Sequence, residues 1–328
     1  MSSVEVTTGA RLHFGLLCGS QETGGRYAGI GMILQDPGWR LVVRAADSCK
    51  YESSEPEMKR RVLALSAQVC RMTGLSGIAV TVRDSMPLHV GLGAGTQLAL
   101  AVATAARIAA GQPRQACSLE LAGQLGRARR SAIGTIGFDR GGFVADGGVT
   151  AGGDTRRIRR IGFPESWRVV VVCSSDVRGL SGSREEIVFR QDLRMPEAVV
   201  EQQRLLVSES IMPSIERVDF AGFQSALAEY GRSAGEFFSR QQGGVYSSQT
   251  IARLCGLPEF RRLHPVQSSW GPAVAVFAES QEQAELHCRN ISASSIAAGL
   301  HCRVTQGQNH GATVRSVAPE QPGHVVRG

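Results

Sequence analysis

The stretch PLHVGLGAGTQLALAVATAA spans residues 87–106 and decides the fold. Three glycines at alternate positions are followed by a stretch rich in alanine and leucine, which favour a helix over residues 97–110. Residues 77–83 alternate like a strand, so the order is strand, glycine loop, helix. Loop amides and the positive end of the following helix bind phosphate, although such a loop can also simply connect two elements. We therefore expect phosphate binding at Gly91, Leu92, Gly93, Ala94, Gly95, Thr96 and Gln97.

Hydrophobic periodicity predicts alternating strands and helices along the rest of the chain. We expect strands at 4–17, 40–45, 77–83, 167–174, 273–278, 301–305 and 312–317, and helices at 57–73, 97–110, 118–127, 197–211, 220–239 and 281–298. The glycine-rich residues 131–153 predict a binding loop or a hairpin, because glycine weakens helices. A chain of 328 residues indicates two domains, and we place their boundary near residue 165.

The basic composition does not indicate nucleic-acid binding. The formal charge is +7, but Lys50 and Lys59 are the sole lysines and the arginines are scattered. The densest group, Arg156, Arg157, Arg159 and Arg160, is more typical of a solvated face than of a polyanion groove. Aromatic residues make up 5% of the chain, too few for a base-stacking platform. A small anionic substrate fits this composition better.

Eight cysteines are spread singly and form no C-x-x-C pair, so we interpret them as reduced core thiols. The dipeptides His287-Cys288 and His301-Cys302 are interpreted as packing rather than zinc ligands. The N-terminal residues lack a signal-peptide pattern, and no window has the ~18 apolar residues of a membrane span. We expect a cytoplasmic protein that binds no membrane, and leave a homodimer open.

Three motifs together resemble the GHMP kinase superfamily. Residues 87–94 match P-x-x-x-G-L-G-[SA], the motif that wraps nucleotide phosphates; residues 8–16 resemble the N-terminal substrate motif; and residues 133–139 lie where the kinases carry a catalytic aspartate. The resemblance implies an α+β, two-domain GHMP-kinase fold. Its N-terminal domain, like ribosomal protein S5 domain 2, would span residues 1–165, and a ferredoxin-like split α/β domain would span 166–328.

The closer resemblance is to the β-ribofuranosylaminobenzene 5′-phosphate synthases, carried by residues 10–16, 87–100, 130–148, 179–182 and 267–272. It implies an enzyme of tetrahydromethanopterin biosynthesis. Such an enzyme joins phosphoribosyl pyrophosphate to 4-aminobenzoate or 4-hydroxybenzoate and releases carbon dioxide and pyrophosphate. The kinases end on a run of glycines where this chain has SSWGP at residues 268–272. Proline lacks an amide donor and tryptophan is bulky, so a kinase phosphate cradle is incomplete here.

The resemblance also implies roles for individual residues. Asp139 aligns roughly with the kinase base, and Asp146 either binds Mg²⁺ or caps a turn. His13 and His89 flank the two motifs and could donate hydrogen bonds or move a proton. No organic cofactor is expected, and magnesium would neutralise the pyrophosphate.

Arginines suit the benzoate carboxylate, because the guanidinium fork pairs with it bidentately. The candidates for this contact are Arg11, Arg26 and Arg130, each of which could instead form a surface salt bridge. A second anion site is expected at Ser181 and Gly182, where an ordinary helix cap is the alternative. The substrate loop is expected at Ser268, Ser269, Trp270 and Gly271.

Two other functions stay open at this point. The chain could be an ATP-dependent small-molecule kinase with Asp139 as its base and the glycine loop around ATP. It could also be a nucleotide-binding sensor that kept the fold and lost the chemistry. A kinase makes ADP, a synthase makes pyrophosphate and carbon dioxide, and a sensor binds ATP without turnover.

Overall fold

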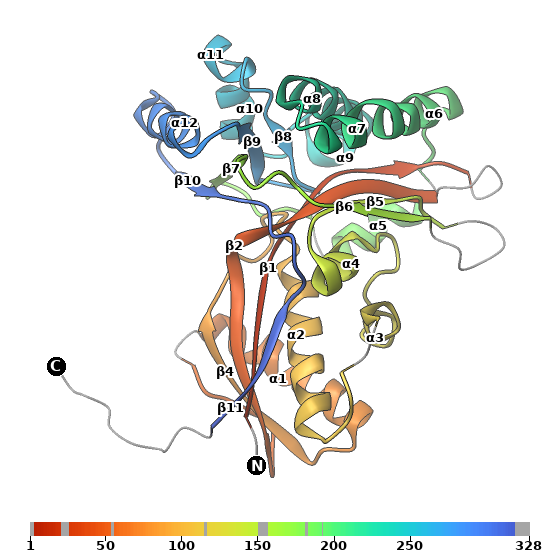
Figure 1. Cartoon of the computed structure of the whole chain (residues 1–328), viewed down its shortest axis with the longest axis vertical. Coiled ribbons are helices and arrows are strands. Elements are labelled where there is room, and N and C mark those ends of the chain that lie inside the picture. Colours follow the sequence, from red (N-terminus) through yellow and green to blue (C-terminus); the bar gives the residue numbers. More distant parts are fainter. Residues whose placement is uncertain are drawn as a thin grey trace.

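The computed structural model describes residues 3–20, 26–53, 56–114, 117–149, 157–180, 183–191 and 193–318. The first of its two sheets has the strand order β11-β1-β2-β4-β3, with β5 between β2 and β6. Its strands are β1 (Ser3–Cys18), β2 (Arg26–Ala46), β3 (Lys50–Tyr51), β4 (Gly77–Asp84), β5 (Phe143–Asp146), β6 (Ile158–Ile161) and β11 (Thr313–Val317). Figure 1 shows α1 (Pro56–Thr73) and α2 (Ala94–Ala109) beside the long β1–β2 ladder.

The central helix α2 is almost wholly buried against the first sheet. Its alanines let the helix backbone approach the strands closely, and the indole nitrogen of Trp39 donates to the Ala94 carbonyl at 2.9 Å. The helix begins three residues earlier than the predicted residue 97. Gly93, its N-cap, has a φ of 70° that glycine adopts without strain, so the loop turns directly into the helix.

The second sheet has the order β10-β7-β9-β8. Its strands are β7 (Arg168–Ser174), β8 (Val266–Gln267), β9 (Val274–Ala278) and β10 (Leu300–Thr305). The remaining helices are α3 (Ser118–Gln124), α4 (Ile133–Arg140), α5 (Ser183–Arg190), α6 (Glu197–Leu205), the π-helical η1 (Leu206–Ile211), α7 (Met212–Glu216), α8 (Phe220–Phe237), α9 (Ser239–Gln242), α10 (Gln249–Gly256), α11 (Pro258–Arg261) and α12 (Gln281–Ala293). Figure 1 shows α8, α10 and α12 beside this sheet.

The last described strand of the chain lies beyond the domain boundary that we expect near residue 165, and it belongs to the first sheet. The strand β11 forms where residues 312–317 predict one, but it pairs with β1 of the first sheet, with Thr7 opposite Thr313. An isolated β-bridge between Leu34 and Gly307 marks where the chain comes back from the second sheet to the first. The chain therefore passes through the second sheet and then completes the first.

Aromatic rings fix the two halves of the molecule to each other. Phe14 of β1 lies 6.2 Å from Phe143 of β5 and 5.9 Å from Phe277 of β9, between ring centroids. Phe223 of α8 contacts both Phe143 and Phe277. Buried aromatic pairs in these geometries contribute about 0.5–1.5 kcal/mol each beyond the area they bury. The core therefore holds β1, β5, β9 and α8 in fixed relative positions.

Residues 131–153 were predicted to be a binding loop or a hairpin; β5 does pair antiparallel with the next strand, β6, but the stretch also contains a helix that was not predicted. The described part, up to residue 149, contains helix α4 and strand β5. Ile133 and Phe138 of α4 are buried, and Asp146 accepts a hydrogen bond from the amide of Ala132 just before the helix. Tertiary packing and this hydrogen bond outweigh the low helix propensity of Gly134 and Gly137.

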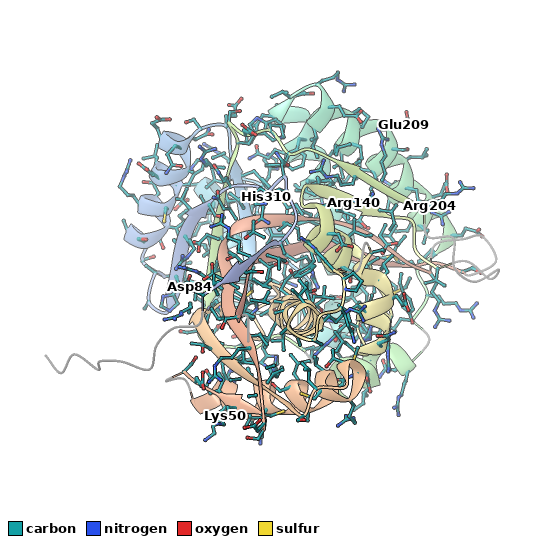
Figure 2. All side chains as sticks on the ribbon, turned by 60° about the horizontal axis from the view of Figure 1, so that its bottom comes forward. Lys50, Asp84, Arg140, Arg204, Glu209 and His310 are labelled. Atoms are coloured by element: carbon teal, nitrogen blue, oxygen red, sulfur yellow. The ribbon has the colours of Figure 1, made fainter. Side chains whose placement is uncertain are left out.

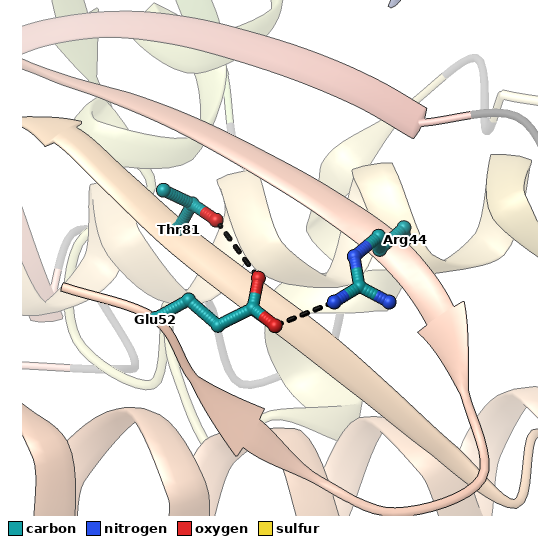
Figure 3. A network of polar contacts seen from close by, with 3 residues as sticks. All are labelled: Arg44, Glu52 and Thr81. Atoms are coloured by element: carbon teal, nitrogen blue, oxygen red, sulfur yellow. Dashed lines mark hydrogen bonds and ion pairs between the residues drawn. The ribbon is translucent and has the colours of Figure 1, made fainter. Parts of the chain in front are cut away.

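Charged residues are distributed over the surface, as the scattered arginines predict. In Figure 2, Lys50 lies at the opposite side of the molecule from Arg204 and Glu209. Figure 3 shows one local network, in which Arg44 and Thr81 donate to the carboxylate of Glu52 and attach the short β3 edge. Among the described residues, no helix is long and apolar enough to span a bilayer.

Candidate active site

A cavity of about 270 Å³ lies between β1, the segment before α4, helices α5 and α8, and the loop after β8. It brings together six of the predicted site residues: Arg11, His13, Thr96, Arg130, Ser269 and Trp270. The rest of the lining that bears on chemistry is Phe14, Arg127, Arg129, Ser131, Glu185, Glu186, Phe189 and Phe238. Four arginines against two glutamates leave the described lining cationic.

Arg11 lies between the N-termini of two helices. A Cβ atom built on Gly93, the N-cap of α2, would be 3.1 Å from its Nε, and one on Gly134 of α4 would be 3.7 Å from the same atom. Burial lowers the pKa of Arg11 to about 10, an effect that the charge of Glu185 partly offsets. Its Nη1 atom is sealed from solvent and has no hydrogen-bond partner among the described residues. A cation beside two positive helix ends is destabilised unless an anion joins it.

Two further arginines lie near the start of α2. A Cβ atom on Gly95 would be 3.5 Å from Nη1 of Arg61 and 3.8 Å from Nη1 of Arg127. The pKa of Arg127 is lowered by burial and by the neighbouring charge of Arg61. With Arg11, these side chains place three positive charges around one helix N-terminus. This end of the site can hold a multiply charged anion.

The glycine loop supports this end rather than lining it. Gly91 (φ 90°) and Gly93 (φ 70°) adopt left-handed conformations, and Leu92 is buried with its carbonyl accepting from the amide of Arg11 at 2.9 Å. Gln97 is fully buried, accepting from Thr8 and donating to Gly134. Of the seven predicted phosphate-binding residues, Thr96 alone is part of the described lining. The loop thus positions Arg11 and starts α2.

A second part of the cavity lining, called the aromatic end below, is formed by Phe189, Phe238 and Trp270. Ring centroids of Phe238 and Trp270 are 4.9 Å apart, and Phe189 is 5.8 Å from Trp270. The guanidinium of Arg130 lies 4.2 Å from the Phe189 ring centroid and 3.5 Å from a carboxylate oxygen of Glu185. The Trp270 indole donates to the other oxygen of Glu185 at 3.3 Å. A flat, apolar ring carrying one negative group fits this combination.

His13 and Ser131 lie on the cavity wall, with Nε2 of His13 3.1 Å from Oγ of Ser131. The backbone of His13 is also held, because its amide donates to Ser268 Oγ and its carbonyl accepts from the Ser269 amide. Burial and the charge of Arg11 lower the pKa of His13 well below its ordinary value. The ring is therefore neutral at neutral pH.

The predicted substrate loop divides into lining and support. Ser269 and Trp270 line the cavity, whereas the buried Ser268 donates to the carbonyl of Gly91 at 2.8 Å. Gly271 (φ 56°) precedes a cis bond to Pro272. The loop therefore joins the glycine loop to the aromatic end.

Two predicted acids lie outside the described lining. Asp139 accepts from the amide and hydroxyl of Ser118 at 2.8 and 2.6 Å, which holds the start of α3. Asp146 is buried, and its two oxygens accept from the amides of Ala132 and Gly148. These contacts correspond to the turn-capping alternative for Asp146. Among described residues, no cluster of three or more acidic, histidine or cysteine side chains could hold a metal ion.

The remaining predicted residues lie elsewhere. Arg26 is over the ring of Tyr27, 5.1 Å from its centroid, and does not line the cavity. His89 lies beside Arg61, whose Nη2 atom is 3.1 Å from its Nε2. Ser181 and Gly182 fall outside the described residues.

Sequence reasoning missed Glu185, Phe189, Phe238, Arg61 and Arg127 as site residues. The run RARR at residues 127–130 was a usable signal for Arg127, because it directly precedes a motif already singled out. Three of the others come from helices α1 and α5, and Phe238 comes from the turn between α8 and α9, in stretches whose sequences look ordinary. No local pattern distinguishes them, so their convergence needed the tertiary structure.

Comparisons with known proteins agree with the fold. The family described as GHMP kinases N terminal domain matches residues 59–139. The mevalonate-3-kinase of Thermoplasma acidophilum, bound to mevalonate, superposes with a TM-score of 0.62 at 13% identity, covering 96% of this chain and 98% of that one. The mevalonate pyrophosphate decarboxylase of Streptococcus pyogenes gives 0.64 at 12% identity, covering 94% and 97%. At these identities the likeness concerns the fold alone.

Curated relatives are closer in sequence. The beta-ribofuranosylphenol 5'-phosphate synthase of Methanothermobacter thermautotrophicus is 28% identical over 292 residues, covering 82% of this chain and 87% of the relative. The protein of that name from Archaeoglobus fulgidus is 26% identical over 330 residues, covering 95% and 99%. The resemblance inferred from the motifs is thereby confirmed. This chain has the GHMP-kinase fold and is similar over most of its length to the β-ribofuranosylphenol 5′-phosphate synthases.

Proposed function

We propose that this protein is a decarboxylating ribosyltransferase that joins phosphoribosyl pyrophosphate to 4-hydroxybenzoate or 4-aminobenzoate, releasing carbon dioxide and pyrophosphate. The observation that carries the proposal is a single cavity lined both by arginines and by aromatic rings. Whole-length similarity to synthases of this type supports it. Because their names specify a phenol product, we favour 4-hydroxybenzoate over the amine.

The arginine end suits the pyrophosphate leaving group. When the bond from ribose C1 to pyrophosphate breaks, its electron pair stays on the pyrophosphate, whose negative charge must be stabilised. Arg11 and Arg127 supply fixed charge there, and the N-terminus of α2 adds the partial charges of its amides. The unpaired Nη1 of Arg11 is the atom that most needs such a ligand.

The aromatic end suits the benzoate ring. Phe189, Phe238 and Trp270 give flat surfaces that orient the ring, and Arg130 is placed to pair with its carboxylate. The long 3.5 Å contact between Arg130 and Glu185 leaves room for the substrate carboxylate to compete. Orientation of the two reactants is the main contribution that such a site makes.

The chemistry can proceed without a protein base. The ring carbon that bears the carboxylate gives an electron pair to ribose C1 as the pyrophosphate leaves. The electrons of the bond to carbon dioxide then return to the ring and restore aromaticity. A reaction that needs no proton transfer suits a site in which His13 is neutral and Glu185 is paired with Arg130. Phosphoryl transfer by a kinase generally uses a base or positioning residue, and Asp139, the candidate, is engaged by Ser118.

Magnesium is proposed to arrive with the pyrophosphate as part of the substrate. Asp146 is not suited to bind a metal ion held permanently by the protein. Both of its carboxylate oxygens accept hydrogen bonds from backbone amides, and it does not line the cavity. Mg²⁺ in such sites is held mostly by phosphate oxygens and water. We also propose a cytoplasmic enzyme of tetrahydromethanopterin biosynthesis that acts as a homodimer and binds small molecules rather than nucleic acid or membranes.

The test is an assay with carboxyl-labelled 4-hydroxybenzoate, phosphoribosyl pyrophosphate and magnesium. We expect labelled carbon dioxide and pyrophosphate in equal amounts, with 4-aminobenzoate run in parallel to rank the two acceptors. ATP with a metabolite panel is the control for the kinase alternative. ADP formation without carbon dioxide release would contradict the proposal, as would ATP binding without any turnover.

A further inference from the structure

The tautomer of His13 follows from its hydrogen bonds. The amide of Gly15 donates to Nδ1 of His13 at 3.4 Å. Because a backbone N–H can only donate, Nδ1 is the acceptor nitrogen of the neutral ring and Nε2 carries the proton. Nε2 lies 3.1 Å from Oγ of Ser131, so His13 donates to this hydroxyl oxygen.

The Ser131 hydroxyl can still donate one hydrogen bond. Its oxygen also accepts from the amide of Ile133 at 3.3 Å, so two donors occupy its acceptor positions. The hydroxyl proton points away from both donors. Ser131 lines the cavity, and in the described part of the chain no hydrogen bond gives that proton an acceptor.

His13 and Ser131 lie beside the arginines of the cavity. Arg11, His13 and Gly15 are alternate residues of β1 and all line the cavity. Arg11 lies beside the start of α2, whereas a Cβ atom on Gly15 would lie 3.1 Å from Tyr230 of α8. His13 therefore lies between these two contacts along the strand, with the hydroxyl of Ser131 next to it.

We propose that the Ser131 hydroxyl donates a hydrogen bond to an anionic oxygen of the substrate at the reacting centre, and that His13 is the positioning residue that aims it. This inference rests on the proposed function. The oxygen belongs either to the pyrophosphate or to the benzoate carboxylate, which share the same acceptor chemistry. Because the imidazole is neutral and buried, it fixes the hydroxyl direction without competing for the anion.

The test compares Ser131→Ala with Ser131→Thr in the complete enzyme. We expect Ser131→Ala to lower kcat/KM about 10- to 100-fold, the effect of losing a hydrogen bond to a charged group. Threonine keeps the hydroxyl and should restore most of the activity. Ser53→Ala is the matched control, since Ser53 also accepts from one backbone amide and donates to a carbonyl but lies outside the cavity lining. An unchanged Ser131→Ala enzyme, or a loss that threonine does not rescue, would overturn the inference.

Calorimetry identifies the acceptor and separates this inference from the proposed function. Wild type and Ser131→Ala are titrated with inorganic pyrophosphate and, separately, with 4-hydroxybenzoate. Weaker binding of one probe assigns the hydroxyl to that anion, and unchanged binding of both probes refutes the inference. These titrations need no turnover, so they still decide the role of Ser131 if the synthase assay fails.

A double-mutant cycle tests the part played by His13. His13→Asn should cost activity in the wild type but much less in the Ser131→Ala background, because His13 acts through Ser131. Equal losses in both backgrounds would show that His13 does not act through Ser131.

Discussion

Replacing Arg11 with methionine should stabilise the protein while weakening its binding of pyrophosphate. Burial lowers the pKa of Arg11 from its ordinary 12.5 to about 10, and 1.36 kcal/mol per pKa unit over this difference of 2.5 gives about 3 kcal/mol. Both folded and unfolded chains are protonated at pH 7, so this destabilisation is fully present there and is relieved as the pH rises through 10. Arg11 is partly exposed, and solvent screening reduces the expected gain to about 1–2 kcal/mol.

The measurement combines chemical denaturation with ligand titration. Arg11→Met should unfold at higher denaturant concentration than the wild type at pH 7. Adding pyrophosphate should then stabilise the wild type strongly and the variant weakly, because a ligand stabilises only the state it binds. We expect the dissociation constant for pyrophosphate to rise about 10- to 100-fold. A variant that is less stable and still binds pyrophosphate normally would refute the reasoning, since Arg11 would then be structural.

Three further predictions follow from the site. Trp270→Ala should raise KM for the benzoate at least fivefold while changing KM for phosphoribosyl pyrophosphate less. Phe238→Ala should act in the same direction. Steady-state kinetics with each substrate varied in turn would measure the two KM values separately. Asp139→Asn should lower the free energy of unfolding by about 1–2 kcal/mol, because the charged carboxylate loses its hydrogen bonds from Ser118. It should not lower kcat more than twofold. A large loss of kcat would instead mean that Asp139 takes part in catalysis. Because the pKa of His13 is depressed, its contribution to stability is present above about pH 6.5 and lost as the pH falls below it, so His13→Asn should flatten the acid side of the stability profile measured by thermal unfolding.

Helices and strands could be predicted where their formation depends on residues close together in the sequence. The uninterrupted run of valines at 169–172 and the alanine-rich stretch after Gly95 act through neighbours in the sequence, and both gave elements in the expected places. Helix α4 within residues 131–149 was not predicted, for the opposite reason. Helix α4 depends on burial of Ile133 and Phe138 and on the carboxylate of Asp146, thirteen residues beyond the helix start. Propensity cannot register such contacts.

The sequence by itself determined the fold class, and the glycine loop in it predicted where the central helix α2 would begin to within three residues. The tertiary structure decided which side chains share the cavity. It placed Arg11 between two helix starts, brought Glu185 and Phe189 from a distant helix, and held Asp139 at α3. The physical reason is range: helix and strand formation depend on residues a few positions apart, whereas a binding site depends on strand pairing and on packing between segments more than a hundred residues apart.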